Sequence, residues 1–269
     1  MSDQKIMLGN EAIARGAYEA GVKVSAAYPG TPSTEISESI VEYKDVIYSE
    51  WSPNEKVATE VAIGASMAGV RSLVSMKHVG VNVASDPLYT ASYIGVNGGM
   101  VLVAADDPGL YSSQNEQDSR MVARAALIPV IEPSDSQEAK DFIKIAYDIS
   151  EKYDRPVMFR TTTRLSHSQC LVKLCERTEP DDKPYVRNIA KNVMMPAMAK
   201  KRHVHVEEMM DLLAKEGSSL SINRAEYRDT SIGFITCGIA YQYVREACPD
   251  ASVLKLGLVN PLPADLIKE

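Results

Sequence analysis

Residues 50–69 read EWSPNEKVATEVAIGASMAG. Ser52 and Pro53 predict a helix start, because a first-turn proline lacks only an N–H that would have no partner there. The predicted helix is rich in Ala and Gly, and such a surface lets another backbone or a flat ligand approach closely. Glu55 lies at its entrance. This carboxylate can simply complement the helix dipole, which is worth about 0.3–1 kcal/mol, or it can serve chemistry.

Strands and helices alternate on both sides of this stretch. Short apolar, β-branched runs predict strands at Val22–Ala27, Val46–Tyr48, Ser72–Ser75, Met100–Ala105, Pro129–Ile131 and Pro156–Arg160. Helical patterns between them cover Glu11–Ala20, Pro53–Gly69 and Ser136–Tyr153, the last preceded by a Ser134…Gln137 capping box. This alternation predicts an α/β fold with a parallel sheet and helices on both faces.

Composition excludes several classes of protein. The chain has 269 residues, 45% of them hydrophobic, and a net charge of −7, which argues against a nucleic-acid-binding surface. No apolar run approaches the roughly 18 residues of a membrane span, so we expect a cytoplasmic protein. The four cysteines lack the C-x2-C spacing of zinc and iron–sulfur sites, and we expect free thiols.

The first candidate binding loop is the turn Tyr28-Pro29-Gly30-Thr31-Pro32-Ser33-Thr34-Glu35. In parallel sheets, ligands bind beyond the carboxyl ends of the strands, where this turn should lie. Two prolines restrict the loop, and Thr31 is its main candidate ligand-binding residue. Ser33 or Thr34 can alternatively be a plain helix cap.

Two further loops should lie at the same edge. Lys77, His78 and Asn82 crowd the loop after the third strand, which favours a polar site, although a lone histidine there can simply be hydrogen-bonded locally. The fourth strand ends in Asp106 and Asp107, and a long polar loop over residues 112–120 follows. Such a long polar loop is more often functional than incidental.

The periodicity stops after residue 167. We predict three segments: a first domain over residues 1–175, a linker with an amphipathic helix over 176–228, and the start of a second α/β domain over 229–269. In the helix, Val204–Lys215, apolar residues at helical spacing should pack on the core. The last segment is too short to form a core alone, which predicts that the chain is part of a longer subunit.

Several local motifs together resemble those of the 2-oxoacid:ferredoxin oxidoreductases, in particular their indolepyruvate-type alpha subunits. The resemblance extends over nearly the whole chain. Its motifs are Leu8-Gly9-Asn10-Glu11-Ala12, the turn 28–35, Glu50-Trp51, Pro53-Asn54-Glu55-Lys56, Met76-Lys77-His78-Val79-Gly80, Ala84-Ser85-Asp86-Pro87, Ala105-Asp106-Asp107-Pro108-Gly109, Ser112-Ser113-Gln114, Lys200-Lys201-Arg202 and Gly238-Ile239-Ala240-Tyr241.

The resemblance implies a thiamine-diphosphate-binding fold, with this chain as the pyrimidine domain. Glu55, nine residues before Gly64, matches the glutamate that binds N1′ of the aminopyrimidine and promotes loss of the cofactor's C2 proton. Thr31 matches a residue that meets the substrate carboxylate. The candidate site residues are therefore Glu55 as catalytic; Thr31, His78 and Asn82 as substrate-binding; and Tyr28, Pro29, Gly30, Glu55 and Gly64 as cofactor-binding.

Two departures refine the implied function. Pyruvate-type relatives place an arginine near the turn that here carries Asp106 and Asp107, as in the arylpyruvate branch, which favours a larger substrate such as indolepyruvate or phenylpyruvate. The diphosphate and Mg²⁺ motif and the cysteine repeats for four-iron four-sulfur clusters are absent. No metal ligands are therefore assigned to this chain, and the resemblance implies a second subunit, in a dimer of heterodimers.

The implied reaction is oxidative decarboxylation to an acyl-CoA and CO₂, with coenzyme A as cosubstrate and ferredoxin as electron acceptor. Two alternatives stay open. The enzyme can act on pyruvate or another 2-oxoacid, or the chain can be a non-catalytic assembly subunit that keeps the fold.

Overall fold

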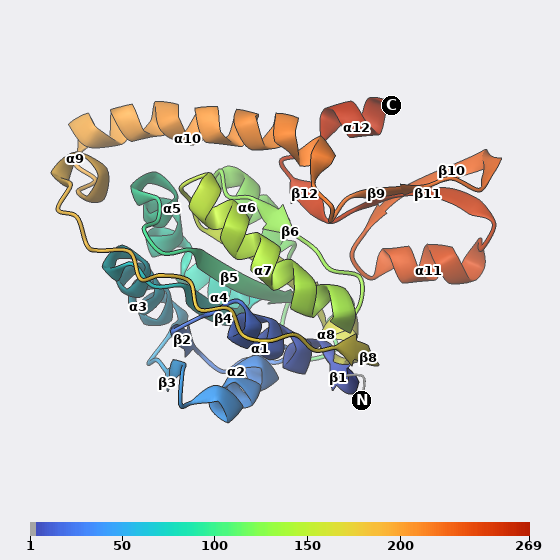
Figure 1. Cartoon of the computed structure of the whole chain (residues 1–269), viewed down its shortest axis with the longest axis horizontal. Helices are drawn as coiled ribbons and strands as arrows, with labels where there is room; N and C mark the ends of the chain where they lie inside the picture. The colour runs from blue at the N-terminus through green and yellow to red at the C-terminus, as the bar shows by residue number, and fades with distance from the viewer. Residues whose placement is uncertain (1–3) are drawn as a thin grey trace.

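Six parallel strands and one antiparallel edge strand form the central sheet of the computed structural model, which describes residues 4–269 (Figure 1). The strand order is β12-β6-β7-β5-β4-β2-β3, and β12 runs antiparallel to β6. The strands are β2 (Val24–Ala27), β3 (Tyr48–Trp51), β4 (Ser72–Lys77), β5 (Met100–Asp106), β6 (Val130–Ile131), β7 (Val157–Thr162) and β12 (Leu258–Asn260). The predicted α/β class with a parallel sheet is confirmed.

Helices cover both faces of this sheet. One face carries α1 (Gly9–Glu19), α2 (Thr34–Ile40) and α7 (Ser136–Lys152). The other carries α3 (Glu55–Ala68), α4 (His78–Val83), α5 (Ser85–Ile94) and α6 (Ser119–Ala125). Each face has its own apolar core, and the central strands β4 and β5 are buried along their whole length. Such strands require helices on both sides.

The register of the strands aligns their carboxyl ends. Ala27 at the end of β2 pairs with Trp51 on β3 and with Ser75 on β4, while Asp106 at the end of β5 pairs with Thr162 on β7. The loops that follow these strands therefore meet at one edge. All three candidate binding loops lie at this edge.

Three local predictions are wrong by one to three residues. Helix α3 begins at Glu55 rather than at Ser52 and Pro53, because the Asn54 side chain accepts the Val57 N–H (3.0 Å) and caps it. The Ser134…Gln137 box is displaced by one residue: Asp135 caps α7 by accepting the Glu138 N–H (2.8 Å). Strand β3 begins only at Tyr48, because a 3₁₀ turn (Val41–Tyr43) hydrogen-bonds residues 46 and 47.

Two smaller sheets flank the main one. Strands β1 (Gln4–Leu8) and β8 (Gln169–Lys173) form an antiparallel pair that the sequence did not predict, with the short helix α8 (Thr163–His167) leading into β8. Near the C-terminal end, β10 (Asp229–Cys237) and β11 (Ala251–Leu256) pair in parallel through α11 (Ala240–Ala247), and β9 (Arg224–Glu226) pairs with β11. Because β9 precedes residue 229 and β12 joins the main sheet, the division at 176 and 229 stays a prediction.

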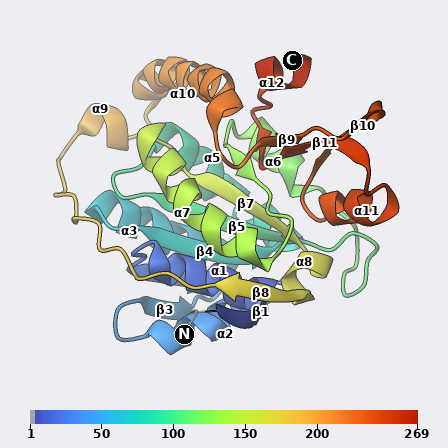
Figure 2. The same ribbon diagram turned by 45° about the vertical axis from the view of Figure 1, so that its right-hand side comes forward.

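The segment between β8 and the C-terminal sheet wraps the body. Residues 174–188 run extended along the molecule to α9 (Ile189–Asn192), as Figures 1 and 2 show. Helix α10 (Pro196–Glu216) then crosses back, followed by a 3₁₀ turn (Gly217–Ser219), and α12 (Ala264–Lys268) lies beside the end of α10. Val206, Met210 and Leu213 are buried, so the predicted apolar stripe of this helix is confirmed.

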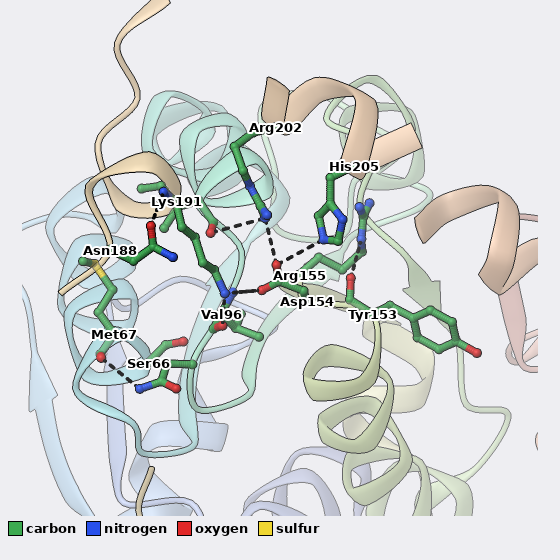
Figure 3. A network of polar contacts seen from close by, with 12 residues as sticks. Ser66, Met67, Val96, Tyr153, Asp154, Arg155, Asn188, Lys191, Arg202 and His205 are labelled. Carbon is green, nitrogen blue, oxygen red and sulfur yellow. Dashed lines mark hydrogen bonds and ion pairs between the residues drawn. The ribbon is translucent and has the colours of Figure 1, made fainter. Parts of the chain in front are cut away.

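A polar cluster fixes α9 and α10 to the body (Figure 3). Asp154, just after α7, accepts hydrogen bonds from Lys191 (2.6 Å), Arg202 (2.8 Å) and the Val96 N–H (2.9 Å). His205 lies 3.2 Å from the same carboxylate. We call these five residues the Asp154 cluster.

The structure also bears on the state of the cysteines and on membrane-spanning helices. The four cysteines are free thiols, as predicted. Over residues 4–269, no helix has both the length and the hydropathy to cross a membrane.

Candidate active site

Glu55 is the first residue of α3 and is largely buried, with 9% of its surface exposed. Its backbone carbonyl accepts the Thr59 hydroxyl (2.8 Å). Within residues 4–269, however, its carboxylate has no hydrogen-bond or ion-pair partner. Its oxygens are not among the fully buried, unpaired polar atoms of the described chain, so they reach solvent. Glu55 is therefore free to bind a ligand that brings its own donor.

Gly80 forms the wall against Glu55. A Cβ atom at Gly80 would lie 2.5 Å from Glu55 Oε1 and 2.6 Å from its Cγ, so no larger residue fits without displacing the carboxylate. Gly80 belongs to α4, directly after β4. Helix α4 therefore packs against the start of α3, and the glycine lets the two segments approach closely.

The turn 28–35 lies beside the same loop. A Cβ atom at Gly30 would lie 3.1 Å from Lys77 Cβ. Tyr28, Pro29 and Thr31 are exposed at this edge, with Tyr28 38% exposed. The Gly30 N–H donates to Thr34 Oγ1 (2.9 Å), and the Ser33 N–H donates to the Gly30 carbonyl (2.8 Å). The turn is thus ordered by its own hydrogen bonds, and the Thr31 side chain remains accessible.

His78 and Asn82 lie on α4 but differ in environment. His78 is 1% exposed, and its Nε2 is 3.2 Å from the Asn115 carbonyl. Since a carbonyl only accepts, Nε2 carries the proton, and the buried Nδ1, which has no partner in the described chain, is an acceptor. Asn82 is exposed. His78 therefore secures the polar loop, while Asn82 is open to solvent or to a ligand.

The two aspartates after β5 have buried partners of their own. Asp106 accepts from Arg160 Nε (2.6 Å) and from the Ser119 N–H (3.1 Å). Asp107 accepts from Thr163 Oγ1 (2.6 Å), the Ser113 hydroxyl (2.5 Å) and the Ser112 N–H (2.8 Å). Burial raises the pKa of Asp107, but the donors Ser113, Thr163 and Ser112 outweigh it and lower the pKa to about 2. Asp106 is therefore paired with the Arg160 guanidinium, and Asp107 is held by neutral donors of the chain itself.

Gly64 lies apart from these residues. It is on the exposed side of α3, nine residues beyond Glu55, and a Cβ atom placed there would meet nothing within 4 Å. The described chain brings Glu55, Gly30 and His78 to one edge but does not bring Gly64 to them. Its cofactor-binding role stays a prediction, which requires contact from another segment.

The sequence analysis assigned no role to Asn10, although it lies in the quoted motif of residues 8–12. Asn10 is fully buried, and its Nδ2 donates to the Pro32 carbonyl (2.7 Å) and to Glu35 Oε2 (3.0 Å). It supports the turn 28–35 from below. In the sequence, the only indication of this role is a polar residue at the junction between a strand and a helix.

The residues around Glu55 fit the aminopyrimidine of thiamine diphosphate. A buried carboxylate without an internal partner can bind a ring nitrogen, and Gly80 keeps the wall beside it flat. Glu55 would hold N1′ of the ring. Among residues 4–269 there is no cluster of three or more His, Cys, Asp or Glu side chains that could bind a metal.

Comparison with known proteins agrees with this geometry. The archaeal indolepyruvate oxidoreductase subunit IorA of Archaeoglobus fulgidus is 46% identical over 278 residues, which cover 99% of this chain and 45% of that protein. The 2-oxoglutarate synthase subunit KorA of Methanocaldococcus jannaschii is 24% identical over 98% of this chain and 85% of that protein. This chain therefore spans somewhat less than half the length of the IorA relative.

A solved structure shares the fold. The 2-oxoglutarate:ferredoxin oxidoreductase from Magnetococcus marinus matches 98% of this chain and 55% of its own, with a TM-score of 0.79 and 20% identity. The family model for the thiamine diphosphate-binding domain of pyruvate flavodoxin/ferredoxin oxidoreductases matches residues 15–231. The chain thus belongs to the pyruvate flavodoxin/ferredoxin oxidoreductase family and contains its thiamine diphosphate-binding domain.

Proposed function

We propose that this chain supplies the aminopyrimidine-activating half of a thiamine diphosphate site. The complete enzyme would decarboxylate aryl-2-oxoacids such as indolepyruvate and phenylpyruvate oxidatively, with coenzyme A, to acyl-CoA and CO₂, and would reduce ferredoxin. The observation that carries the proposal is Glu55, a buried carboxylate with no partner in residues 4–269, packed against Gly80.

The role of Glu55 follows from its chemistry. Thiamine diphosphate, when bound, supplies the nucleophilic carbon that attacks the 2-oxo group and accepts the electrons left when CO₂ departs. Glu55 would hold and transfer a proton at N1′ of the aminopyrimidine, which requires a carboxyl group. The packing of α4 against Glu55, which is only 9% exposed, would limit the access of water to that proton. Thr31, together with Asn82 on α4, would contact the substrate. His78 would contribute through the polar loop, whose Asn115 carbonyl it contacts.

A partner should complete the site. Exposed apolar side chains flank Glu55: Trp51 is 49% exposed and Val83 48%. The open surface at Gly64 adds a region where another backbone can approach. We infer a second subunit or further segment that binds the diphosphate and Mg²⁺ and carries four-iron four-sulfur clusters, in a dimer of heterodimers. Free thiols and the charged surface go with a cytoplasmic location.

The preferred substrate should be aromatic. The IorA relatives act on indolepyruvate according to their names, and Arg160, the arginine nearest the Asp106 turn, is neutralised by Asp106 and Glu132. Without an arginine clamp, selectivity should come from the apolar part of the substrate. Burying an aromatic ring contributes about 1.5–3 kcal/mol, or roughly 10- to 100-fold preference over a methyl group.

The test uses the assembled enzyme. Stopped-flow reduction of ferredoxin is followed with indolepyruvate, phenylpyruvate, pyruvate and 2-oxoglutarate. We expect kcat/KM for the aryl acids to exceed that for pyruvate at least about tenfold, and Thr31→Val to raise KM for all four acids. Equal efficiency on pyruvate or 2-oxoglutarate would favour the broader 2-oxoacid alternative. No turnover with any acid, in an enzyme with full cofactor content, would favour an assembly role.

A further inference from the structure

A groove of about 420 Å³ lies where β7 ends, at the same edge of the sheet as Glu55. Its walls are formed by α8 with the residue after it and by the polar loop that follows β5. The lining residues are Tyr111, Thr163, Arg164, His167 and Ser168. Of these five, Thr163 alone enters the site described above, as a donor to Asp107.

The groove is cationic. Arg164 is exposed, and its guanidinium has no hydrogen-bond or ion-pair partner between residues 4 and 269; the guanidinium carbon lies over the Tyr243 ring, 6.0 Å from its centroid. His167 is 40% exposed and lies 3.7 Å from Glu35. In contrast, Arg120 and Arg160 at the same edge are paired with carboxylates. In a chain of net charge −7, an unpaired arginine beside a histidine is a local site for an anion.

The walls of the groove are fixed from within. Leu165 and Ser166, between Arg164 and His167, are buried, and a Cβ atom at Gly9 would lie only 2.1 Å from the Leu165 carbonyl. The opposite wall is tied to α8 because Thr163 donates to Asp107, which also holds the Ser112 N–H. Arg164 and His167 therefore project from an anchored turn of helix, and Tyr111, 74% exposed, offers a flat ring across from them.

The position of the groove indicates which kind of anion can bind there. Strand β7 is two places from β4, whose following helix contacts Glu55, so at about 4.8 Å per strand the groove is roughly 10 Å from it. The carboxylate of a 2-oxoacid is bonded directly to the reacting carbonyl carbon and stays at the reaction centre. A cosubstrate whose phosphates lie far from its reacting end can place them outside that centre. Arginine is also the side chain best suited to phosphate, and an exposed tyrosine ring can stack on a base.

We propose that Arg164 and His167 bind a phosphate group at the remote end of an extended, nucleotide-containing cosubstrate, with Tyr111 against its base. Only the identity of that cosubstrate as coenzyme A rests on the function proposed above. The anion-binding property of the groove does not.

The test measures binding separately from turnover. Adenosine 3′,5′-bisphosphate, which carries the phosphates and base but no thiol, is titrated calorimetrically into the assembled enzyme. We expect Arg164→Ala to weaken its binding about tenfold, as expected for the loss of one charge-assisted hydrogen bond, and to raise KM for coenzyme A by a similar factor. Arg187→Ala is the matched control, because Arg187 is exposed on the extended segment and has no side-chain partner in the described chain.

Equal binding of the bisphosphate by wild type and Arg164→Ala, or no binding by wild type, would overturn the proposal. A rise in KM for the 2-oxoacid, with bisphosphate binding unchanged, would also overturn it and assign the groove to the substrate carboxylate. If no 2-oxoacid reduces ferredoxin but bisphosphate binding still depends on Arg164, the proposed function fails and the groove assignment stands.

Discussion

Glu55 and Asp154 are both largely buried carboxylates at helix ends, yet their surroundings are opposite. Asp154 accepts from Lys191, Arg202 and the Val96 N–H, with His205 at 3.2 Å (Figure 3). Glu55 has no such partner within residues 4–269. Burial alone would raise the pKa of Asp154, but the adjacent Lys191 and Arg202 outweigh it and lower the pKa.

On the function proposed above, the difference separates a structural carboxylate from one that acts on a cofactor. A fully paired cluster such as that of Asp154 joins elements and needs nothing further. A carboxylate on a largely buried residue, without an internal partner and still reaching solvent, can receive a donor from a ligand. This comparison predicts that substitutions at Glu55 change turnover without affecting stability, and that substitutions at Asp154 do the reverse.

The largest expected effect is that of Glu55→Gln on catalysis. An amide keeps the size of the side chain but cannot transfer a proton to N1′, so kcat should fall by about 10²- to 10⁴-fold, the range of general acid–base effects. The midpoint of urea unfolding should not move, because the carboxylate has no internal hydrogen bond to lose. Thiamine C2–H exchange, followed by NMR on the assembled enzyme, is the direct measurement. Exchange at the wild-type rate would remove Glu55 from this role.

Asp154→Ala should give the largest loss of stability. Removing one partner of a buried ion pair costs about 3–5 kcal/mol; Asp154 is 22% exposed, so solvent screening reduces this to about 2–3 kcal/mol. Asp154 also has φ = 53°, a conformation that asparagine tolerates better than alanine. Asp154→Asn should therefore be milder. Urea unfolding measures both, and an unchanged kcat per folded molecule is expected for each.

The pH dependence of the Asp154 cluster has a definite sign. Because the folded-state pKa of Asp154 is lowered, its contribution is present above the usual aspartate pKa and is lost as the pH falls through the folded value. Acid should therefore weaken wild type more than Asp154→Asn. Identical acid sensitivity in the two proteins would contradict this role.

How much of this could be predicted from sequence depends on the separation of the partners. Glu55 and the turn 28–35 could be predicted as site residues because each belongs to a local pattern, Glu55 at a predicted helix start and the turn after a predicted strand. The pairing of β1 with β8 joins residues more than 160 positions apart, and nothing in either segment specifies the other. The Asp154 cluster was missed for the same reason, since its cations come from a segment that sequence alone indicated only as linker and amphipathic helix.

The contact between Gly80 and Glu55 could not be predicted from local sequence patterns either. Gly80 belongs to the motif of residues 76–80. A glycine is needed there because the Glu55 carboxylate lies beside it, and this contact forms only when α4 packs on the start of α3. The sequence cannot say which cations acquire a carboxylate partner on folding, and Arg160 did whereas Arg164 did not.

Asp107 extends the comparison to a carboxylate that lies at the catalytic edge but is fully paired. Its pKa of about 2, against 3.8 for an ordinary aspartate, corresponds to about 2 kcal/mol of stability that is present above pH 4. About 1 kcal/mol of this should be lost between pH 5 and pH 3. Urea unfolding of wild type and Asp107→Asn at both pH values isolates the effect. An equal loss in both proteins would show that Asp107 does not contribute.

The smallest expected effect distinguishes two glycines. Gly80→Ala places a methyl group 2.5 Å from Glu55 Oε1, so the carboxylate must move, whereas Gly64→Ala meets nothing within 4 Å. Displacing a proton-transferring group from its geometry is expected to lower kcat by about tenfold, well short of removing the group. In the chain alone, Gly64→Ala should leave stability unchanged or slightly raised, because alanine favours a helix by about 1 kcal/mol over glycine.

The two variants differ again in the assembled enzyme. If Gly64 lies against a partner, its alanine variant should bind the second subunit more weakly, measured as the dissociation constant of the complex, while Gly80→Ala assembles normally and turns over slowly. Normal kcat in Gly80→Ala would mean that the carboxylate of Glu55 can shift without consequence for turnover. The contrast between Glu55 and the paired Asp154 would then no longer depend on the exact position of the Glu55 carboxylate. Normal assembly of Gly64→Ala would limit the small-residue face of α3 to packing within this chain.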